Sequence, residues 1–216
     1  KLGSIGEELR AAGVDVVCLN RRPGWDFRVA GRMAAAARER RLEVVHAHLY
    51  SPFFYAALAK PLTLPRPFKL ILTEHGRPFP DVVSPLRRAV NRLVLDRLAD
   101  RVNACSAFSG RALASNDGFA GRRVEVIENG IDADKYGPAA DKPGLKRRLG
   151  LDPARRYVLH VARHHPVKDQ PTLLRGFAGA AAAVPDADLL MAGDGPLRGE
   201  LEALAAALGV ADRVRF

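Results

Sequence analysis

Short apolar runs alternate along this chain with longer segments in which apolar residues recur every three or four positions. The short runs are typical of buried strands and the longer segments of amphipathic helices. Strands are expected at 14–19, 42–46, 68–73, 102–105, 124–127, 157–161, 187–191 and from 214 onward. Helices are expected at 5–12, 29–41, 51–60, 85–99, 107–115, 142–149, 171–183 and 197–208. This repetition with short connections predicts parallel strands joined by right-handed crossovers.

A stretch rich in proline, glycine, alanine and aspartate, residues 137–143, interrupts the alternation and is typical of a linker. We therefore expect an α/β protein with two Rossmann-like domains, residues 1–139 and residues 140–216. The chain does not begin with methionine, and its last residues are those of a strand that stops within a sheet. We expect an internal fragment whose first domain lacks its N-terminal strand and whose second domain is truncated.

Composition and charge narrow the class of protein. A hydrophobic content of 48% excludes a wholly disordered chain, and no apolar run reaches the length of a membrane-spanning helix. The net charge of +10 suits nucleic acid, the anionic face of a membrane or an anionic small substrate. Because the sequence has no zinc-finger, helix-turn-helix or aromatic RNA-binding pattern, we rank nucleic acid third. The two cysteines fit no metal or redox spacing, which favours free thiols in a reducing, cytoplasmic setting.

Ligands of parallel sheets bind beyond the carboxyl ends of the strands, so the loops after strands are the candidate sites. After the strand at 157–161, a loop presents Arg163 and Lys168 directly before a helix. Two cations beside the free N–H groups of a helix N-terminus suit a diphosphate. A pair of solvated loop cations explains these residues equally well.

A second loop of the same domain, after the strand at 187–191, contains Gly193, Asp194 and Gly195. Glycines let a backbone approach a ligand closely. Alone this is a weak signal, because glycines after a strand often make an ordinary tight turn.

In the first domain, His75 follows a strand and precedes a glycine, within Thr73-Glu74-His75-Gly76. A histidine at the carboxyl end of a strand is well placed to bind a substrate or carry a proton, although a loop histidine without a role is nearly as good an interpretation. Residues 128–132 end another strand, and their Asn129-Gly130 pair predicts a turn that sets the direction of the chain.

Two groups of histidines could suggest a metal site. His46 and His48 are two apart at a strand end, and His160, His164 and His165 cluster in sequence. The first pair has no third ligand at a suitable spacing, and the second group is divided between a strand and its loop. We therefore expect no metal site.

In this order and spacing, the four loop segments resemble those of the retaining glycosyltransferases of family 4, which have the two-domain GT-B fold. In the first domain the resemblance is carried by residues 42–48, 73–76, 99–106 and 126–132. In the second domain the loop with Arg163 and Lys168 is similar to the family pattern Val-Gly-Arg, a short variable stretch, then Lys-Gly.

The resemblance implies roles for the candidate residues. Arg163 and Lys168 would hold the donor diphosphate and stabilise charge on the departing nucleotide, where fixed cations act most strongly. His75 would line the catalytic cleft near the transferred sugar and the acceptor. The loop from Gly193 to Pro196 would lie close to the nucleotide. Enzymes of this type use no metal or other cofactor, because the nucleotide-sugar is itself a substrate.

Two departures from the family pattern concern the donor loop, where Ala162 and Asp169 replace glycines. A carboxylate at Asp169 would repel a diphosphate unless it points away or caps the helix. The glycine-rich acceptor loop and the pair of glutamates typical of the family are not in this sequence. We therefore expect the fragment itself to be inactive.

The resulting expectation is a hexosyltransferase parent that uses a UDP- or GDP-sugar donor and a glycan or lipid-linked acceptor. It would serve polysaccharide biosynthesis at the cell envelope from the cytoplasm, with peripheral docking at the inner face of an anionic membrane and no nucleic-acid partner. One alternative is a non-catalytic nucleotide- or polyanion-binding module on the same fold. Another is a sugar-nucleotide epimerase of GT-B architecture.

Overall fold

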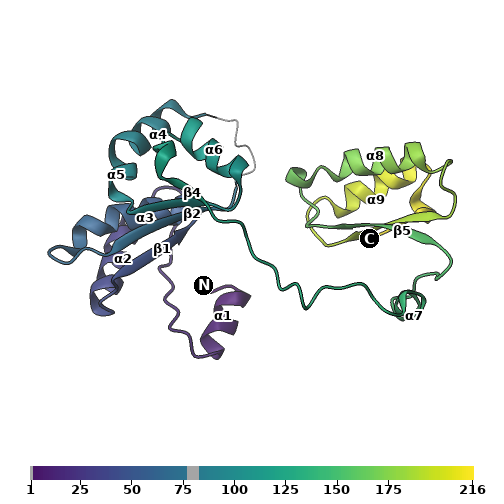
Figure 1. The fold of residues 1–216 in the computed structure, drawn as a ribbon, viewed down its shortest axis with the longest axis horizontal. Helices are drawn as coiled ribbons and strands as arrows, with labels where there is room; N and C mark the ends of the chain where they lie inside the picture. Colours follow the sequence, from purple (N-terminus) through teal and green to yellow (C-terminus); the bar gives the residue numbers. More distant parts are fainter. Residues whose placement is uncertain (1, 77–82) are drawn as a thin grey trace. The chain divides into compact units, whose positions relative to one another are not determined.

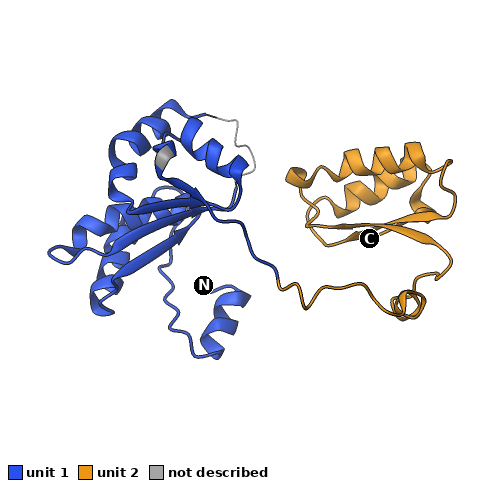
Figure 2. Cartoon of the chain, viewed as in Figure 1, with its two compact units in different colours: residues 1–131 blue, residues 132–216 orange. Residues whose placement is uncertain are grey.

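A computed structural model describes residues 2–76 and 83–216. The chain divides into two compact units, unit 1 at Lys1–Ile131 and unit 2 at Asp132–Phe216 (Figure 2). The expected domain boundary, between residues 139 and 140, lies in a segment without helix or strand and stays a prediction.

Unit 1 contains parallel strands with helices between them (Figure 1). Its strands are β1 (Val44–His48), β2 (Lys69–Glu74), β3 (Arg101–Ala104) and β4 (Val124–Val126). Its helices are α1 (Ser4–Ala11), α2 (Arg28–Glu39), α3 (Tyr50–Ala59), α4 (Pro85–Val90), α5 (Asp96–Leu98) and α6 (Ala107–Ser115), with a π-helical turn at Asn91–Leu95 and 3₁₀ turns at Lys60–Thr63 and Gly121–Arg123.

The strands of unit 1 pair in parallel in the order β1-β2-β3-β4, within the described residues. When parallel strands follow one another in sequence order, right-handed crossovers bring the connecting helices to one face of the sheet. Accordingly, α3 packs against β1 and β2, and α6 packs against β3 and β4. The core between these layers includes the fully buried side chains of Phe53, Leu70, Leu72 and Leu113.

Local sequence signals explain two of these helices. In α2, alanines three or four residues apart (Ala30, Ala34, Ala37) form the buried stripe, and small side chains let the helix pack closely on α3. In α6, the Ser106 hydroxyl accepts a hydrogen bond from the Ser109 N–H and so caps the start of the helix, a position where serine is favoured.

The expected strand at 14–19 is wrong. After α1 this segment forms no strand in the described structure. A strand needs the N–H and C=O groups of a neighbour, and within the described residues this segment pairs with no strand of the sheet. The segment is held instead by an ion pair of 2.7 Å between Arg40 Nε and the Asp15 carboxylate.

Unit 2 has the same plan on a smaller scale. Its elements are α7 (Lys142–Arg148), β5 (Arg156–Val161), a 3₁₀ turn at Pro166–Lys168, α8 (Gln170–Ala180), β6 (Ala187–Ala192), α9 (Arg198–Ala207), a 3₁₀ turn at Ala211–Arg213 and β7 (Val214–Arg215). The strands are parallel in the order β5-β6-β7 within the described residues. Figure 1 shows α8 and α9 on one face of this sheet, over a core that includes Leu174, Leu189, Met191 and Leu201.

Three smaller expectations need correction. The helix expected at 85–99 is interrupted by the π-helical turn and ends at Leu98. The turn expected at Asn129-Gly130 lies instead at 133–135, because the Asp132 carboxylate accepts hydrogen bonds from the N–H groups of Asp134 and Lys135. Both cysteines are free, as expected, but half-buried, and Cys18 lies in the segment that forms no strand.

Across residues 2–76 and 83–216, no helix combines the length and the apolar character that a membrane crossing requires.

Candidate functional site

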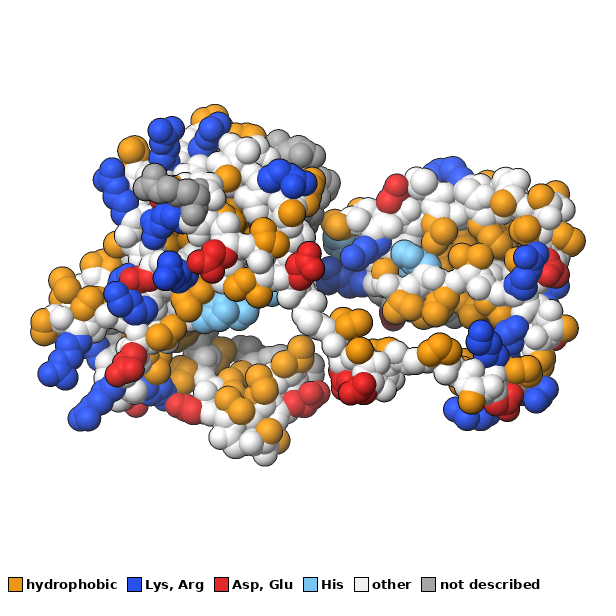
Figure 3. Space-filling model, in the orientation of Figure 1, with side chains coloured by type: hydrophobic (Ala, Val, Ile, Leu, Met, Phe, Trp, Pro, Cys, Tyr) orange, Lys and Arg blue, Asp and Glu red, His pale blue; other side chains and the backbone are white. Residues whose placement is uncertain are grey.

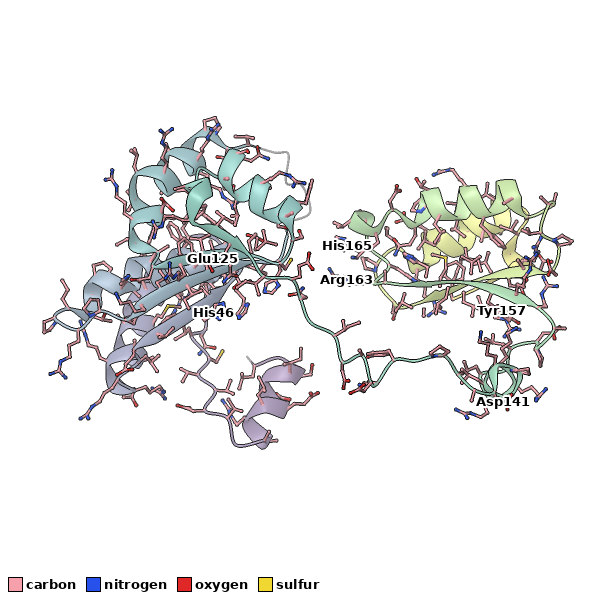
Figure 4. The ribbon with its side chains drawn as sticks, viewed as in Figure 1. His46, Glu125, Asp141, Tyr157, Arg163 and His165 are labelled. Atoms are coloured by element: carbon pink, nitrogen blue, oxygen red, sulfur yellow. The ribbon has the colours of Figure 1, made fainter. Side chains whose placement is uncertain are left out.

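The carboxyl ends of β5 and β6 form one candidate site, in unit 2. Because these strands are parallel neighbours, the loops that follow them leave the same edge of the sheet. The two loops are joined by backbone hydrogen bonds: His164 N–H donates to Asp194 O over 2.9 Å, and Leu197 N–H donates to His164 O over 3.3 Å. Figure 4 shows Arg163 and His165 at this end of β5.

Both glycines of the β6 loop are required by this close approach. A Cβ atom on Gly193 would lie 2.1 Å from Ala162 O, and one on Gly195 would lie 2.3 Å from His164 O. Both glycines also have φ values, +149° and +156°, that L side chains rarely adopt. The glycine-rich turn therefore brings the two loops together, a role that its sequence alone did not indicate.

The two cations of the β5 loop, Arg163 and Lys168, lie between the end of β5 and the start of α8. The backbone of this loop is fixed by Gln170, the first residue of the helix, whose buried Nε2 donates to Arg163 O over 2.9 Å. The side chains of Arg163 and Lys168 are exposed, and neither forms an ion pair within the described residues. Two free cations thus lie in the loop that leads into the first turn of α8. The N–H groups of Thr172 and Leu173 donate to Asp169 O and Pro171 has none, so the helix dipole, and not a set of free N–H groups, favours an anion there.

Asp169 has an unusual backbone conformation at the start of α8. Its φ and ψ of 47° and 42° are left-handed, a region that favours glycine and tolerates aspartate and asparagine better than most residues. Its carboxylate makes no capping hydrogen bond to the helix. This conformation is the one that glycine adopts most readily, which accounts for the glycine of the family pattern. The exposed carboxylate of Asp169 adds a negative charge directly after Lys168 in sequence, in the same loop as Arg163.

His164 is the most buried residue of the β5 loop. Its ring is fully buried, packs edge-on against Phe216 and has no hydrogen-bond partner for either nitrogen in the described structure. Neither this burial nor the contact of Gln170 was predicted, because the sequence places both residues in an ordinary polar loop.

The second candidate site is in unit 1, at the carboxyl ends of β1 and β2. Residues two apart on a strand point to the same face, so His46 and His48 lie on one side while Ala47 is buried on the other. His75 follows β2, and its Nε2 lies 2.8 Å from Nδ1 of His48. The His48 ring is 4.3 Å from the His46 ring and 5.1 Å from the His75 ring, measured between centroids. Figure 3 shows pale-blue histidine side chains gathered on the surface of unit 1.

A hydrogen-bonded chain across the sheet holds His46. The buried Thr73 hydroxyl donates to Asn103 Oδ1 over 2.5 Å, and His46 Nε2 lies 2.6 Å from the same hydroxyl oxygen. Because the hydroxyl proton is used on Asn103, His46 Nε2 must be the donor of the second bond. His46 is therefore fixed in the tautomer with its proton on Nε2.

The environment lowers the pKa of His48. Partial burial disfavours the charged ring, and repulsion from His46 and then from His75 adds to the effect. A histidine with a lowered pKa is mostly neutral near pH 7, so it can both donate and accept a hydrogen bond.

The turn after His75 is stabilised locally. The buried Glu74 carboxylate accepts a hydrogen bond of 3.0 Å from the Gly76 N–H, and Gly76 has a φ of +95°. This turn therefore fixes the backbone on both sides of His75.

The predicted site residues fall into two groups. Arg163, Lys168, Gly193, Asp194 and Gly195 come together at one sheet edge of unit 2, whereas His75 belongs to unit 1. Among the described histidines, cysteines, aspartates and glutamates, no group of three or more is arranged to hold a metal ion. The sequence analysis considered His48 only as a possible metal ligand and assigned it no other role. The spacing of His46 and His48 nevertheless indicated that both side chains lie on one face of the strand.

Known families and proteins match both units. Residues 3–135 match the model of Glycosyltransferase Family 4, and residues 141–216 match that of glycosyl transferases group 1. A D-inositol 3-phosphate glycosyltransferase of Mycobacterium sp. (strain KMS) is 35% identical over 137 residues, which cover 61% of this chain and 30% of that protein. The putative glycosyltransferase EpsF of Bacillus subtilis is 37% identical over 114 residues, 51% of this chain and 29% of EpsF. The matched segments thus cover about 30% of the length of these relatives.

Solved structures share the fold. Anabaena HepE in complex with UDP and glucose superposes with a TM-score of 0.80 at 22% identity, over 99% of this chain and 58% of HepE. A glycosyltransferase from Rickettsia africae gives a TM-score of 0.78 at 19% identity, over 99% of this chain and 57% of that protein. Both the expected GT-B class of fold and the expected family are confirmed. With residues 3–135 matched by its family model, this chain belongs to Glycosyltransferase Family 4.

Proposed function

We propose that the full-length gene product transfers a sugar from a UDP- or GDP-linked donor to a glycan or lipid-linked acceptor, with retention of anomeric configuration. The observation that carries this proposal is the pair of unpaired cations, Arg163 and Lys168, in the loop that leads into α8. The complexes of HepE with UDP and with UDP-glucose support a nucleotide-sugar donor. The name of the mycobacterial relatives supports a phosphate-bearing or polyol acceptor as one candidate.

Breakage of the bond between sugar and diphosphate leaves negative charge on the departing nucleotide. Arg163 and Lys168 would lower the barrier by stabilising that charge, which develops most fully in the transition state. The loop is pre-organised by Gln170 and by the glycines of the β6 loop, so little reorganisation is needed at the moment of reaction. His75 would face the transferred sugar and the acceptor from unit 1.

The donor-site assignment predicts the effect of removing each cation. In the full-length gene product, Arg163→Ala or Lys168→Ala should lower kcat for sugar transfer by roughly a hundredfold or more, because a fixed charge at the leaving group is lost. The rate is measured as UDP or GDP released from a panel of nucleotide-sugars. Arg175→Ala is the matched control, since it removes an exposed cation from the same helix, α8. Wild-type rates in all three variants would refute the assignment.

A basic groove in unit 1 supports a second partner, an anionic membrane surface. The groove has a volume of about 970 Å³ and lies beside the amino ends of β1 and β2. Its lining carries four cations and a single carboxylate, namely Arg38, Arg41, Arg66, Lys69 and Glu43. Two leucines of the lining, Leu42 and Leu64, are 42% and 65% exposed. Cations beside exposed leucines are the combination that suits lipid headgroups and the acyl region beneath them.

Vesicle sedimentation tests this surface. Each well-placed cation contributes about 1 kcal/mol to binding of an anionic leaflet, so Arg41→Glu combined with Arg66→Glu should weaken binding about tenfold or more. Arg147→Glu combined with Arg148→Glu, two exposed cations of α7, should have a smaller effect. Equal binding to neutral and anionic vesicles would contradict the proposal.

A further inference from the structure

The contact between His48 and His75 joins two histidines that the sequence places 27 residues apart. Nδ1 of His48 and Nε2 of His75 are separated by 2.8 Å, a hydrogen-bonding distance, and the rings are stacked at an angle of 26°. The two backbones are held in register by the pairing of His48 with Thr73 in the β1–β2 ladder. The contact is therefore built on two paired strands of one sheet.

This bond limits the protonation states of the pair. Two imidazole nitrogens can share a hydrogen bond when one carries a proton and the other offers a lone pair. The bond exists when both rings are neutral or when one is charged, but not when both are charged, because two N–H groups would then face each other. A charge on His75 therefore opposes protonation of His48, whose pKa is lowered first by desolvation and then by its two histidine neighbours.

We propose that His48 is a positioning residue for His75, which it holds in one ring orientation and one tautomer at the carboxyl edge of the sheet. This inference rests on the proposed function in one respect, that His75 faces the substrates. His48 is itself held from the other side by the ring of His46, whose orientation is fixed by Thr73. The line of side chains from Asn103 through Thr73, His46 and His48 thus ends on His75.

The neighbours of His48 favour its neutral form. The titratable groups that act on His48 are His46 on the same strand and His75 after β2, and both oppose its protonation. A neutral His48 ring can either donate a hydrogen bond to His75 or accept one from it, so the contact is retained.

Nuclear magnetic resonance of the ring nitrogens of the six histidines tests the contact directly. In the unsubstituted protein at alkaline pH, His75 should show a single tautomer, because its Nε2 is engaged by His48. In His48→Phe, which keeps a ring but removes the nitrogens, His75 should show a mixture of tautomers. His46→Phe is the matched control on the same face of β1 and should leave the single tautomer of His75 in place. The same tautomer populations in His48→Phe and in the unsubstituted protein would overturn the proposal.

Kinetics of the full-length gene product supply the second readout, with UDP-glucose as the probe donor. We expect kcat to fall about ten- to a hundredfold in His48→Phe, with the donor KM unchanged, because a displaced catalytic group reacts slowly. His48→Asn offers an amide near the position of Nδ1 and should recover most of the loss. Equal losses in His48→Phe and His48→Asn would overturn a positioning role.

The two readouts separate this proposal from the proposed function. If His48→Phe releases the tautomer of His75 while both His48→Phe and His75→Ala retain full turnover, the positioning contact is upheld and the assignment of His75 to the reaction is rejected. If His75→Ala abolishes turnover while the tautomer of His75 is the same with and without His48, the assignment of His75 to the reaction is upheld and the positioning contact is rejected.

Discussion

At the scale of single residues, Asp169 combines two features at the start of α8: a left-handed backbone and an exposed carboxylate without a capping bond. We predict that Asp169→Asn and Asp169→Gly both tighten UDP binding about three- to tenfold at low salt, because each removes a negative charge beside the proposed diphosphate site. Asparagine tolerates the left-handed conformation, so it isolates the charge from the backbone. Calorimetric titration of UDP measures the effect. A gain in the glycine variant alone would mean that backbone strain, and not charge, limits affinity.

Residue patterns predicted where the candidate site residues lie in the fold but not how their loops are held. The positions of Arg163 and Lys168 before a helix followed from the strand–loop–helix order. The left-handed backbone of Asp169, the bond from Gln170 to Arg163 and the bond between His48 and His75 did not. Each of these depends on distances in the folded chain that neither spacing nor composition contains.

At the scale of elements, the start of α2 depends on a buried carboxylate, Asp26. It accepts a hydrogen bond of 2.9 Å from Arg28 Nε and one of 3.1 Å from the Arg22 N–H. The bond from Arg28 and then the bond from the Arg22 N–H lower the pKa of Asp26 to about 2. A lowered folded-state pKa means that the stabilisation is complete above the unfolded-state pKa near 4 and is lost as pH falls toward 2.

Asp26→Asn should therefore lower the free energy of unfolding of unit 1 at pH 7, and the difference from the unsubstituted protein should shrink between pH 4 and pH 2. Urea unfolding at several pH values, followed by fluorescence of Trp25, the single tryptophan, measures this difference. Asp15→Asn is the control, because Asp15 pairs with Arg40 at the surface and such pairs contribute little. A difference that is the same at pH 7 and pH 2.5 would show that the charge of Asp26 is not the cause.

Helices and strands were predicted best where the signal lies entirely within the segment that forms the element. The stripe of α2 and the N-cap of α6 are local signals, and both helices formed where expected. The failure at 14–19 has the opposite cause: its short apolar run favours a strand, but a strand also needs hydrogen bonds to a partner edge, which a local sequence window does not contain.

At the scale of the whole molecule, the restart of the strand–helix pattern correctly predicted that each unit has its own parallel sheet and its own core. The net charge of +10 left the partner open, and it is the folded chain that gathers Arg38, Arg41, Arg66 and Lys69 around one groove. These residues come from α2, from the segments around it and from β2, so that their grouping is a property of the fold.

The most direct test of the central claim is equilibrium binding of UDP and GDP to the full-length gene product, measured by calorimetry for the unsubstituted protein, Arg163→Ala, Lys168→Ala and Arg175→Ala. Charge-assisted hydrogen bonds to a diphosphate are each worth about 1.5–3 kcal/mol. We therefore predict that Arg163→Ala and Lys168→Ala each weaken binding of the preferred nucleotide at least about tenfold, while Arg175→Ala leaves it unchanged. Equal affinity in all four proteins would contradict the donor site proposed for the β5 loop, and with it the mechanism of sugar transfer.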